Sequence, residues 1–322
     1  MSEGKSASCR LYAILARDGR SAVVFRRGPS RQVLVLRWWF DGDRIEAGQW
    51  LNGRIYERRC DLSPDGDLLI YFAAKWNTTM GTWTAVSRTP YLTALALWAK
   101  GDAWGGGGVF DGAYAIGLNH FDARLVRPGA TKATIRTWHP LGGDVEQATG
   151  VVPNHFKVQP WGEHAGRGAD NPIHDHRIRR DGWSCVDRGE KGRNGDSKGF
   201  SWVLNSPEIY QRQTPVPQTK GVLLLRRILK AIGQRDGPWY VEDHEILTAE
   251  GTVLRHIPEC SWADWQLNGD LLFARESCLY RLLKIHAADE VSDPLANVRL
   301  VADLGPLTFT SVYAPDWARQ WP

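Results

Sequence analysis

The side chains best suited to chemistry in this sequence are the histidines of the segment DNPIHDH at residues 170–176. If this segment is extended, His174 and His176 project from one face of the chain, because side chains alternate along a strand. Two imidazoles on one face form an edge of a metal site, and Asp170 or His164 would supply a third ligand and leave a catalytic position open. The alternative is that these histidines are hydrogen-bonded groups of a surface loop. We expect no cofactor, with a divalent metal at Asp170, His174 and His176 as the alternative.

Other segments that could do chemistry lack residues that the chemistry needs. The glycine run at residues 105–108 could hold a phosphate group, but Val109, Phe110 and Asp111 do not begin a helix, as a phosphate-binding loop requires. We therefore expect a flexible loop or a close-packed backbone at these glycines.

The elements that would position such residues are expected to be short strands, because one hairpin pattern recurs along the chain. Residues 60–72 read CDLSPDGDLLIYF, and residues 265–274 read WQLNGDLLFA. In both, a turn of Pro, Asp, Asn or Gly precedes a run of residues that suit a pleated sheet. Weaker copies are LARDGRSAVVF at residues 15–25 and LTAEGTVL at residues 247–254. Each copy predicts a β-hairpin.

A second pair of similar segments extends the repeat. Residues 36–43, LRWWFDGD, match residues 95–102, LALWAKGD, in their apolar run and their Gly-Asp turn. With its SPDG hairpin and the related copies, the chain resembles the TolB-like and WD-type β-propellers over residues 10–105 and 238–302. This resemblance implies an all-β fold with a single propeller of four-stranded blades. The chain length, with long loop insertions, favours five blades, six blades being the alternative count.

The expected layout follows from that resemblance. Residues 1–9 are expected to form a disordered lead, and residues 10–322 a single propeller domain with a loop-rich insertion at about residues 146–198. The first blade would take its four strands from residues 11–15, 22–26, 33–38 and 44–46. In the second blade, residues 75–90 are expected to be an insertion between two strands.

The third blade is expected at residues 112–146, and the chain is expected to close its ring at the C-terminal end. There, residues 307–312 would add a strand to the first blade, with Trp317 and Trp321 covering the seam. Because the sequence has 16 tryptophans, we expect most of them to pack between neighbouring blades.

Composition argues against several classes of partner. The chain has 40 basic and 36 acidic residues in a near-even mixture, whereas a nucleic-acid-binding protein usually has a clustered basic face. There are two local excesses, Arg177 with Arg179 and Arg180, and Arg226 with Arg227 and Lys230. We expect each to be a solvated face, with contact to an acidic partner as the alternative. We also expect no membrane partner, since no apolar run approaches the 18 residues that a span needs.

The cysteines indicate a compartment. Five cysteines are present, widely spaced and without a Cys-x-x-Cys pair, which is typical of reduced thiols in the cytoplasm. The N-terminal residues MSEGKSASC have no apolar signal region. We expect a cytoplasmic protein, whereas the TolB relatives are exported.

The function that we expect is that of a protein-binding or assembly module without catalysis of its own, with another protein as its partner. The binding loops are expected around Trp76, Trp83, Trp104 and Trp161. The alternative is a propeller enzyme. It would be metal-dependent at the His-x-His site, or a glycoside hydrolase using two carboxylates. Asp111 and Asp243 lie near predicted strand ends and could contribute to such a pair, but at both positions we favour a capped or solvated aspartate.

Overall fold

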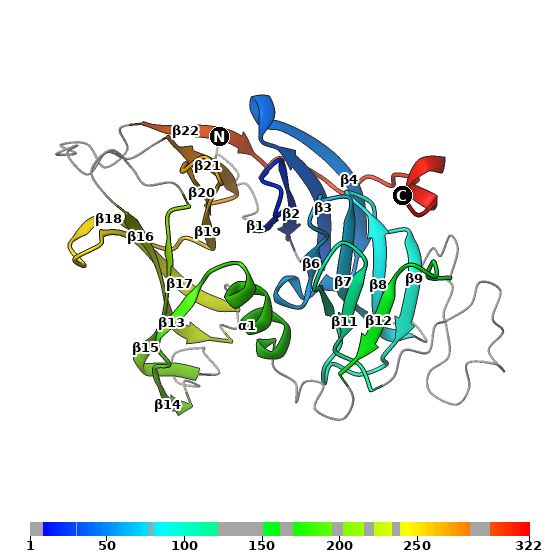
Figure 1. Ribbon diagram of the computed structural model, residues 1–322, viewed down its shortest axis with the longest axis horizontal. Helices are drawn as coiled ribbons and strands as arrows, with labels where there is room; N and C mark the ends of the chain where they lie inside the picture. The colour runs from blue at the N-terminus through cyan, green and yellow to red at the C-terminus, as the bar shows by residue number, and fades with distance from the viewer. Residues whose placement is uncertain are drawn as a thin grey trace, which may run out of the picture. The chain divides into compact units, whose positions relative to one another are not determined.

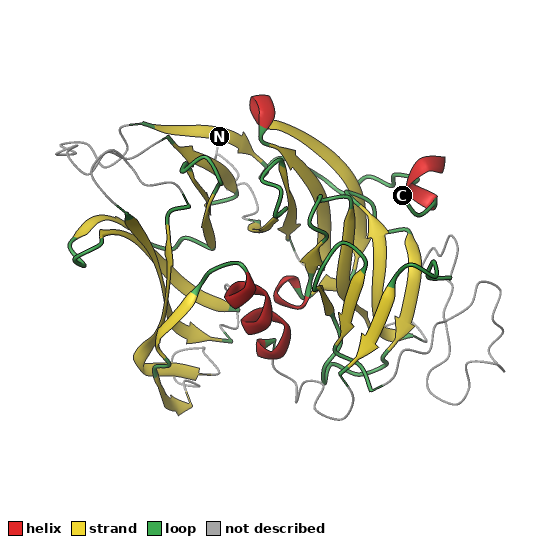
Figure 2. Ribbon diagram, viewed as in Figure 1, coloured by secondary structure: helices red, strands yellow, loops and turns green. Residues whose placement is uncertain are grey.

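The computed structural model describes residues 9–29, 31–76, 80–121, 151–161, 170–194, 202–215, 222–233, 239–283 and 297–322. His164 and most of the predicted third blade lie outside these residues. The chain divides into two compact units, one of residues 1–12 and 179–306 and the other of residues 13–178 and 307–322. We call them the first and the second unit. Strands make up most of the regular structure in both (Figures 1 and 2).

The first sheet is an antiparallel meander in the order β1-β2-β3-β4. Its strands are β1 (Arg10–Leu15), β2 (Ser21–Arg27), β3 (Gln32–Trp39) and β4 (Arg44–Asn52). The turn between β1 and β2 closes where Ala16 N–H donates to the Ser21 carbonyl at 2.8 Å, with Gly19 at a φ of 74°. All four strands expected for the first blade are confirmed.

The second sheet contains the SPDG turn. It has the order β5-β7-β8-β9, formed by β5 (Arg54–Ile55), β7 (Leu68–Lys75), β8 (Gly81–Arg88) and β9 (Ala94–Ala99), and β6 (Asp61–Leu62) pairs with β7. In the turn, the Ser63 hydroxyl donates to the Asp65 carboxylate at 2.5 Å, and Gly66 takes a φ of 79°. The predicted hairpin is therefore confirmed.

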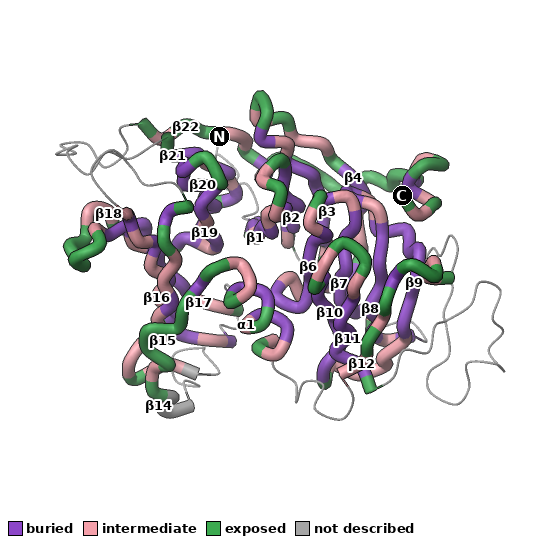
Figure 3. Tube along the Cα trace, in the orientation of Figure 1, coloured by how far each residue is buried: buried purple, intermediate pink, exposed green. Residues whose placement is uncertain are grey.

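The expected insertion at residues 75–90 is wrong, because this range contains β8. Strand β8 pairs with β7 along its whole length, from Leu68 opposite Arg88 to Lys75 opposite Gly81. Both strands are buried on both faces, as Figure 3 shows. The run Thr82–Ser87 mixes threonine and serine with apolar residues, and for this reason the sequence was interpreted as a polar loop although the strand is buried.

The third sheet is short and contains the one parallel pair of strands among the described residues. Strand β10 (Gly108–Phe110) is antiparallel to β11 (Ala115–Leu118), and β12 (Lys157–Pro160) runs parallel to β11. Phe110, Ile116 and Leu118 pack with side chains of the second sheet in one buried cluster. The second and third sheets thus share a core.

The first unit contains two further sheets. One is formed by β13 (Ser184–Asp187), β14 (Glu190–Asn194), β15 (Trp202–Gln213), β16 (Leu223–Ile232), β17 (Tyr240–Thr248) and β18 (Val253–Ile257). The other is a meander of β19 (Trp262–Trp265), β20 (Leu271–Arg275), β21 (Cys278–Leu282) and β22 (Val298–Asp303). The predicted hairpin at residues 265–274 is the connection of β19 and β20, where Gln266 N–H donates to the Asp270 carbonyl at 2.9 Å.

The second basic group is a solvated face only in part, because Arg227 is buried whereas the Lys230 side chain is 45% exposed. Arg226 pairs with Glu245 at 3.2 Å, Arg227 with Glu242 at 3.5 Å, and Lys230 with Asp243 at 2.7 Å, so the charges form a ladder between β16 and β17. Opposite charges across two strands stabilise their pairing. Within the other group, Arg177 is also buried, with 3% of its surface exposed.

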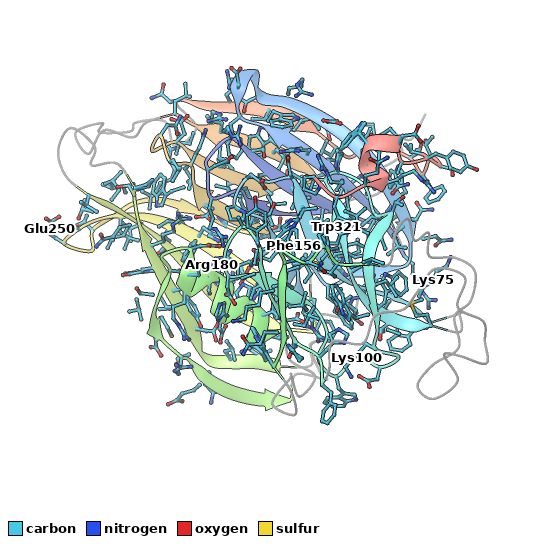
Figure 4. All side chains as sticks on the ribbon, turned by 45° about the vertical axis from the view of Figure 1, so that its right-hand side comes forward. Lys75, Lys100, Phe156, Arg180, Glu250 and Trp321 are labelled. Carbon is cyan, nitrogen blue, oxygen red and sulfur yellow. The ribbon has the colours of Figure 1, made fainter. Side chains whose placement is uncertain are left out.

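The C-terminal segment does not form the expected strand at residues 307–312. It instead lies against the rest of the second unit as a segment without strand pairing, followed by the short helix η5 (Asp316–Arg319). The Gln49 side chain donates to the Val312 carbonyl at 2.9 Å, and the Trp317 ring lies 5.5 Å from that of Tyr91. The Trp321 ring lies 4.9 Å from that of Phe156 (Figure 4). The two tryptophans therefore cover side chains of the second and third sheets.

The described residues form five sheets, whose strand pairs are antiparallel apart from β11 with β12. The all-β class is therefore confirmed, while the closed ring of blades stays a prediction. One α-helix is described, α1 (Asn171–Arg180), and no helix in the described ranges is both long and apolar enough to cross a membrane.

Candidate binding surface

One end of the second sheet presents connections with exposed aromatic side chains. Strands β7 and β9 end there and β8 begins there, since Lys75 pairs with Gly81 and the Lys100 N–H donates to the Thr82 carbonyl at 2.9 Å. Figure 4 labels Lys75 and Lys100, which mark this end. Trp76 follows β7 immediately and is 55% exposed.

The connection from β9 to β10 brings a second segment to the same end. Gly106 N–H donates to the Asn119 carbonyl at 2.8 Å, and Asn119 N–H donates to the Gly107 carbonyl at 3.0 Å. These bonds hold the segment before β10 beside the segment after β11. Each segment carries one exposed aromatic residue, Trp104 at 66% and Phe121 at 63%. We call Trp76, Trp104 and Phe121 the aromatic rim.

A buried arginine fixes the backbone on both sides of Trp104. Arg59, the last residue of the short helix η2 (Glu57–Arg59), is 3% exposed, and its Nη1 donates to the carbonyls of Ala103 at 2.8 Å and Gly105 at 2.6 Å. Its Nε pairs with the Asp170 carboxylate at 2.5 Å. Because both neighbours of Trp104 are held from the inside, the indole is presented to solvent by a rigid backbone.

The glycines of the run fit this anchored backbone and leave no room for side chains. A Cβ at Gly106 would lie 2.2 Å from the Phe72 ring, and one at Gly107 would lie 2.2 Å from the Arg59 carbonyl. Both residues have φ near 85°, at 84° and 86°, a region that favours glycine. The Gly107 N–H donates to the Thr84 hydroxyl at 2.7 Å. The close-packed backbone expected at this run is therefore confirmed.

The predicted tryptophans have different environments. Trp76 and Trp104 lie in exposed connections, but Trp83 lies within β8 and is 1% exposed, so it belongs to the core. Trp161 follows β12 and is half-buried, with its ring 5.7 Å from that of His176. Sequence reasoning missed Phe121, because a single aromatic residue beside Asn119 and His120 forms no pattern.

The predicted histidine segment is helical, so the extended geometry assumed for it is wrong. Residues 171–180 form α1, whose second residue is Pro172, a residue that suits the first turn of a helix. On a helix, residues two apart point about 200° from one another. His174 is buried with 2% exposed, whereas His176 is exposed and its Nε2 lies 2.8 Å from the Asp111 carboxylate.

The three predicted metal ligands are therefore not brought together as a set. Asp170 pairs with Arg59, His176 pairs with Asp111, and His174 Nδ1 lies 3.6 Å from the Asp175 carboxylate. Across the described ranges, no group of three or more His, Cys, Asp or Glu residues is arranged to hold a metal ion. His164 is not among the described residues.

The two carboxylates considered for glycoside hydrolysis belong to different units. Asp111 directly follows β10, as predicted, and pairs with His176. Asp243 lies inside β17, where burial acts to raise its pKa, but bonds from Lys230, the Glu259 N–H and His256 outweigh burial and hold the pKa below its ordinary value. A general acid needs a raised pKa, so Asp243 does not suit that role.

Comparison with known proteins adds little to this picture. No family model matches the sequence, and no curated protein matches it. Among solved structures, that of an uncharacterized protein from Listeria monocytogenes EGD-e aligns over 93% of this chain and 84% of that chain, with 10% identity and a TM-score of 0.26. A likeness this low carries no argument about fold or function.

Proposed function

We propose that the chain is a five-bladed β-propeller and that it acts as a protein-binding module in the cytoplasm. The five sheets follow one another along the chain, and two of them are complete four-stranded meanders. Successive sheets in the second unit are joined directly, since the Asp18 N–H donates to the Pro64 carbonyl at 3.0 Å and the Phe110 N–H to the Asp61 carboxylate at 2.7 Å. Blades of a propeller pack on their neighbours in this manner.

The observation that carries the binding function is the presentation of Trp104. Interface hot spots are enriched in tryptophan, and an anchor that is already rigid loses little conformational entropy on binding. Trp104 is 66% exposed between two carbonyls that the buried Arg59 holds. A Trp side chain held outward in this way leaves apolar surface exposed to water in the free protein, which is unfavourable. A partner protein that covers the aromatic rim would remove this surface from water.

Site-specific photo-cross-linking tests this proposal. A benzoylphenylalanine replaces Trp104 or Phe121 in the full chain, and a control carries it at Tyr313, which is 84% exposed in the C-terminal segment. After irradiation in lysate of the native host, we expect one protein to be captured from positions 104 and 121 but not from 313. Excess unmodified chain should compete for it. Equal capture from all three positions, or none from positions 104 and 121, would contradict the proposal.

A further inference from the structure

The C-terminal segment at residues 307–313 has the sequence of a β-strand but is not one. Five of the seven residues in LTFTSVY are β-branched or aromatic, and Pro306 and Pro315 lie just outside it. Four of its side chains are large, apolar and exposed, namely Leu307 at 36%, Phe309 at 44%, Val312 at 39% and Tyr313 at 84%. The segment nevertheless forms no strand with the described residues.

The backbone of this segment is almost unpaired. With the part of the chain that the structure describes, it makes two hydrogen bonds, one from the Gln49 side chain to the Val312 carbonyl at 2.9 Å and one from the Thr310 hydroxyl to the Thr308 carbonyl at 3.4 Å. In a strand, the backbone groups of alternate residues point to opposite edges. Both bonded carbonyls belong to even-numbered residues, so in strand geometry the odd-numbered residues of 307–313 present a free edge.

We propose that this free edge pairs with the same segment of a second copy of the chain, in an antiparallel ribbon whose two-fold axis passes through Thr310. Such pairing puts residue 307 opposite 313 and residue 309 opposite 311, so each residue of the free edge meets another of the same edge. The exposed Leu307 and Tyr313 side chains also meet, which removes apolar surface from water. Addition of a strand to an open edge recurs in protein recognition.

The charge of the segment favours a second copy as the occupant. Residues 304–315 contain no charged side chain, although 24% of the chain is charged. Two copies therefore approach without repulsion, whereas a charged partner would find no opposite charge in the segment. The other edge is directed towards β4, where Gln49 contacts Val312 and the Trp50 ring lies 5.8 Å from that of Phe309. With one free edge per copy, the assembly closes as a dimer.

The first test is the dependence of mass on concentration. Seven residues per copy bury less than the roughly 800 Å² per partner of a standard interface, so the dimer is weak. Sedimentation velocity of the full chain between about 1 and 300 µM should show a monomer at the low end and a dimer at the high end. A monomer at every concentration would overturn the proposal.

Proline variants test which edge pairs. Ser311→Pro removes an N–H from the free edge and should weaken the dimer about tenfold or more. Thr308→Pro is the matched control, because its N–H points to the other edge, and it should dimerise within about twofold of the parent. Equal loss in the two variants would contradict the assignment of the free edge.

Cysteine variants test the register, in a chain with Cys185→Ser that lacks the exposed native thiol. Thr310→Cys puts two cysteines opposite each other at the axis, with Cα atoms about 4.5 Å apart, which permits a disulfide. The cysteines of Thr308→Cys lie about 14 Å apart, too far for one. Both threonines are exposed. Mild oxidation should therefore link Thr310→Cys into a dimer at least about tenfold more than Thr308→Cys.

Equal yields of linked dimer from the two cysteine variants would mean that copies meet by random collision, and the proposal would fail. The residues of this interface are not those of the aromatic rim, so the inference does not depend on the proposed binding function.

Discussion

At the scale of single residues, Arg59 determines how the aromatic rim is presented. Its guanidinium lies over the rings of Tyr56 and Phe72, at 4.9 and 5.2 Å from their centroids, and pairs with Asp170, whose side chain is 10% exposed. A buried ion pair is a weak source of stability by itself, but removal of one partner leaves an uncompensated charge. The residue therefore couples the stability of the second unit to the position of Trp104.

The first prediction concerns this pair. Arg59→Met should lower the free energy of unfolding by about 3–5 kcal/mol, as measured by urea denaturation. The double variant Arg59→Met with Asp170→Leu should lose less than the sum of the two single variants. Arg20→Met removes an ion pair with Asp18 at the surface and should leave the midpoint unchanged. Additive losses in the double variant would show that Arg59 and Asp170 do not interact.

The second prediction concerns His244, whose side chain is 1% exposed on β17. Burial lowers its pKa to about 4 from an ordinary value of 6.5, so the folded protein keeps this imidazole neutral. The unfolded chain binds the proton below about pH 6.5, so stability is complete above that value and declines as the pH falls towards 4.

Between pH 7 and pH 5, His244 should therefore account for a loss of about 2 kcal/mol of unfolding free energy. Urea denaturation of the parent and of His244→Gln at both pH values measures it, because the variant lacks this titration but keeps the others. An equal pH dependence in the two proteins would mean that His244 titrates normally when folded.

At the scale of elements, the glycine run allows the backbone of the β9–β10 connection to pack closely against η2 and β7. The third prediction is that Gly107→Ala lowers the free energy of unfolding by more than about 2 kcal/mol, because the new methyl group meets a backbone carbonyl at a positive φ. Gly112→Ala is the matched control, since nothing lies within 4 Å of its Cβ position. Its stability should change by no more than about 0.5 kcal/mol. Similar effects at both glycines would contradict the close packing.

Element types were predictable where one local signal decided them. The turns at Gly19, Gly66 and Gly269 all take positive φ, and each connects two antiparallel strands as the sequence indicates. Helix α1 was not predicted because its only buried apolar residues are Ile173 and Ile178. The other two buried positions of the helix are occupied by the polar residues His174 and Arg177, so the apolar residues alone do not show the helical period. Polar residues at buried positions hide the pattern, since their burial depends on partners distant in sequence, such as Asp170 with Arg59.

At the scale of the whole molecule, the sequence predicted the class of fold better than the site. Repeated hairpins are local, so the all-β class and the first meander could be read from single segments. The aromatic rim depends instead on pairings between residues far apart in the chain, such as Gly106 with Asn119 and Arg59 with Ala103. No local pattern could have distinguished the exposed Trp104 from the buried Trp83.

The measurement that tests the binding function most directly is the affinity of the cross-linked partner, once purified, for three versions of the full chain by titration calorimetry. Trp104→Ala should bind at least about tenfold more weakly than the parent, because truncation of a central aromatic anchor costs on the order of 2 kcal/mol. Tyr313→Ala removes an even more exposed aromatic side chain, from the C-terminal segment, and should bind within about twofold of the parent. Equal affinity of the parent and Trp104→Ala would contradict the account.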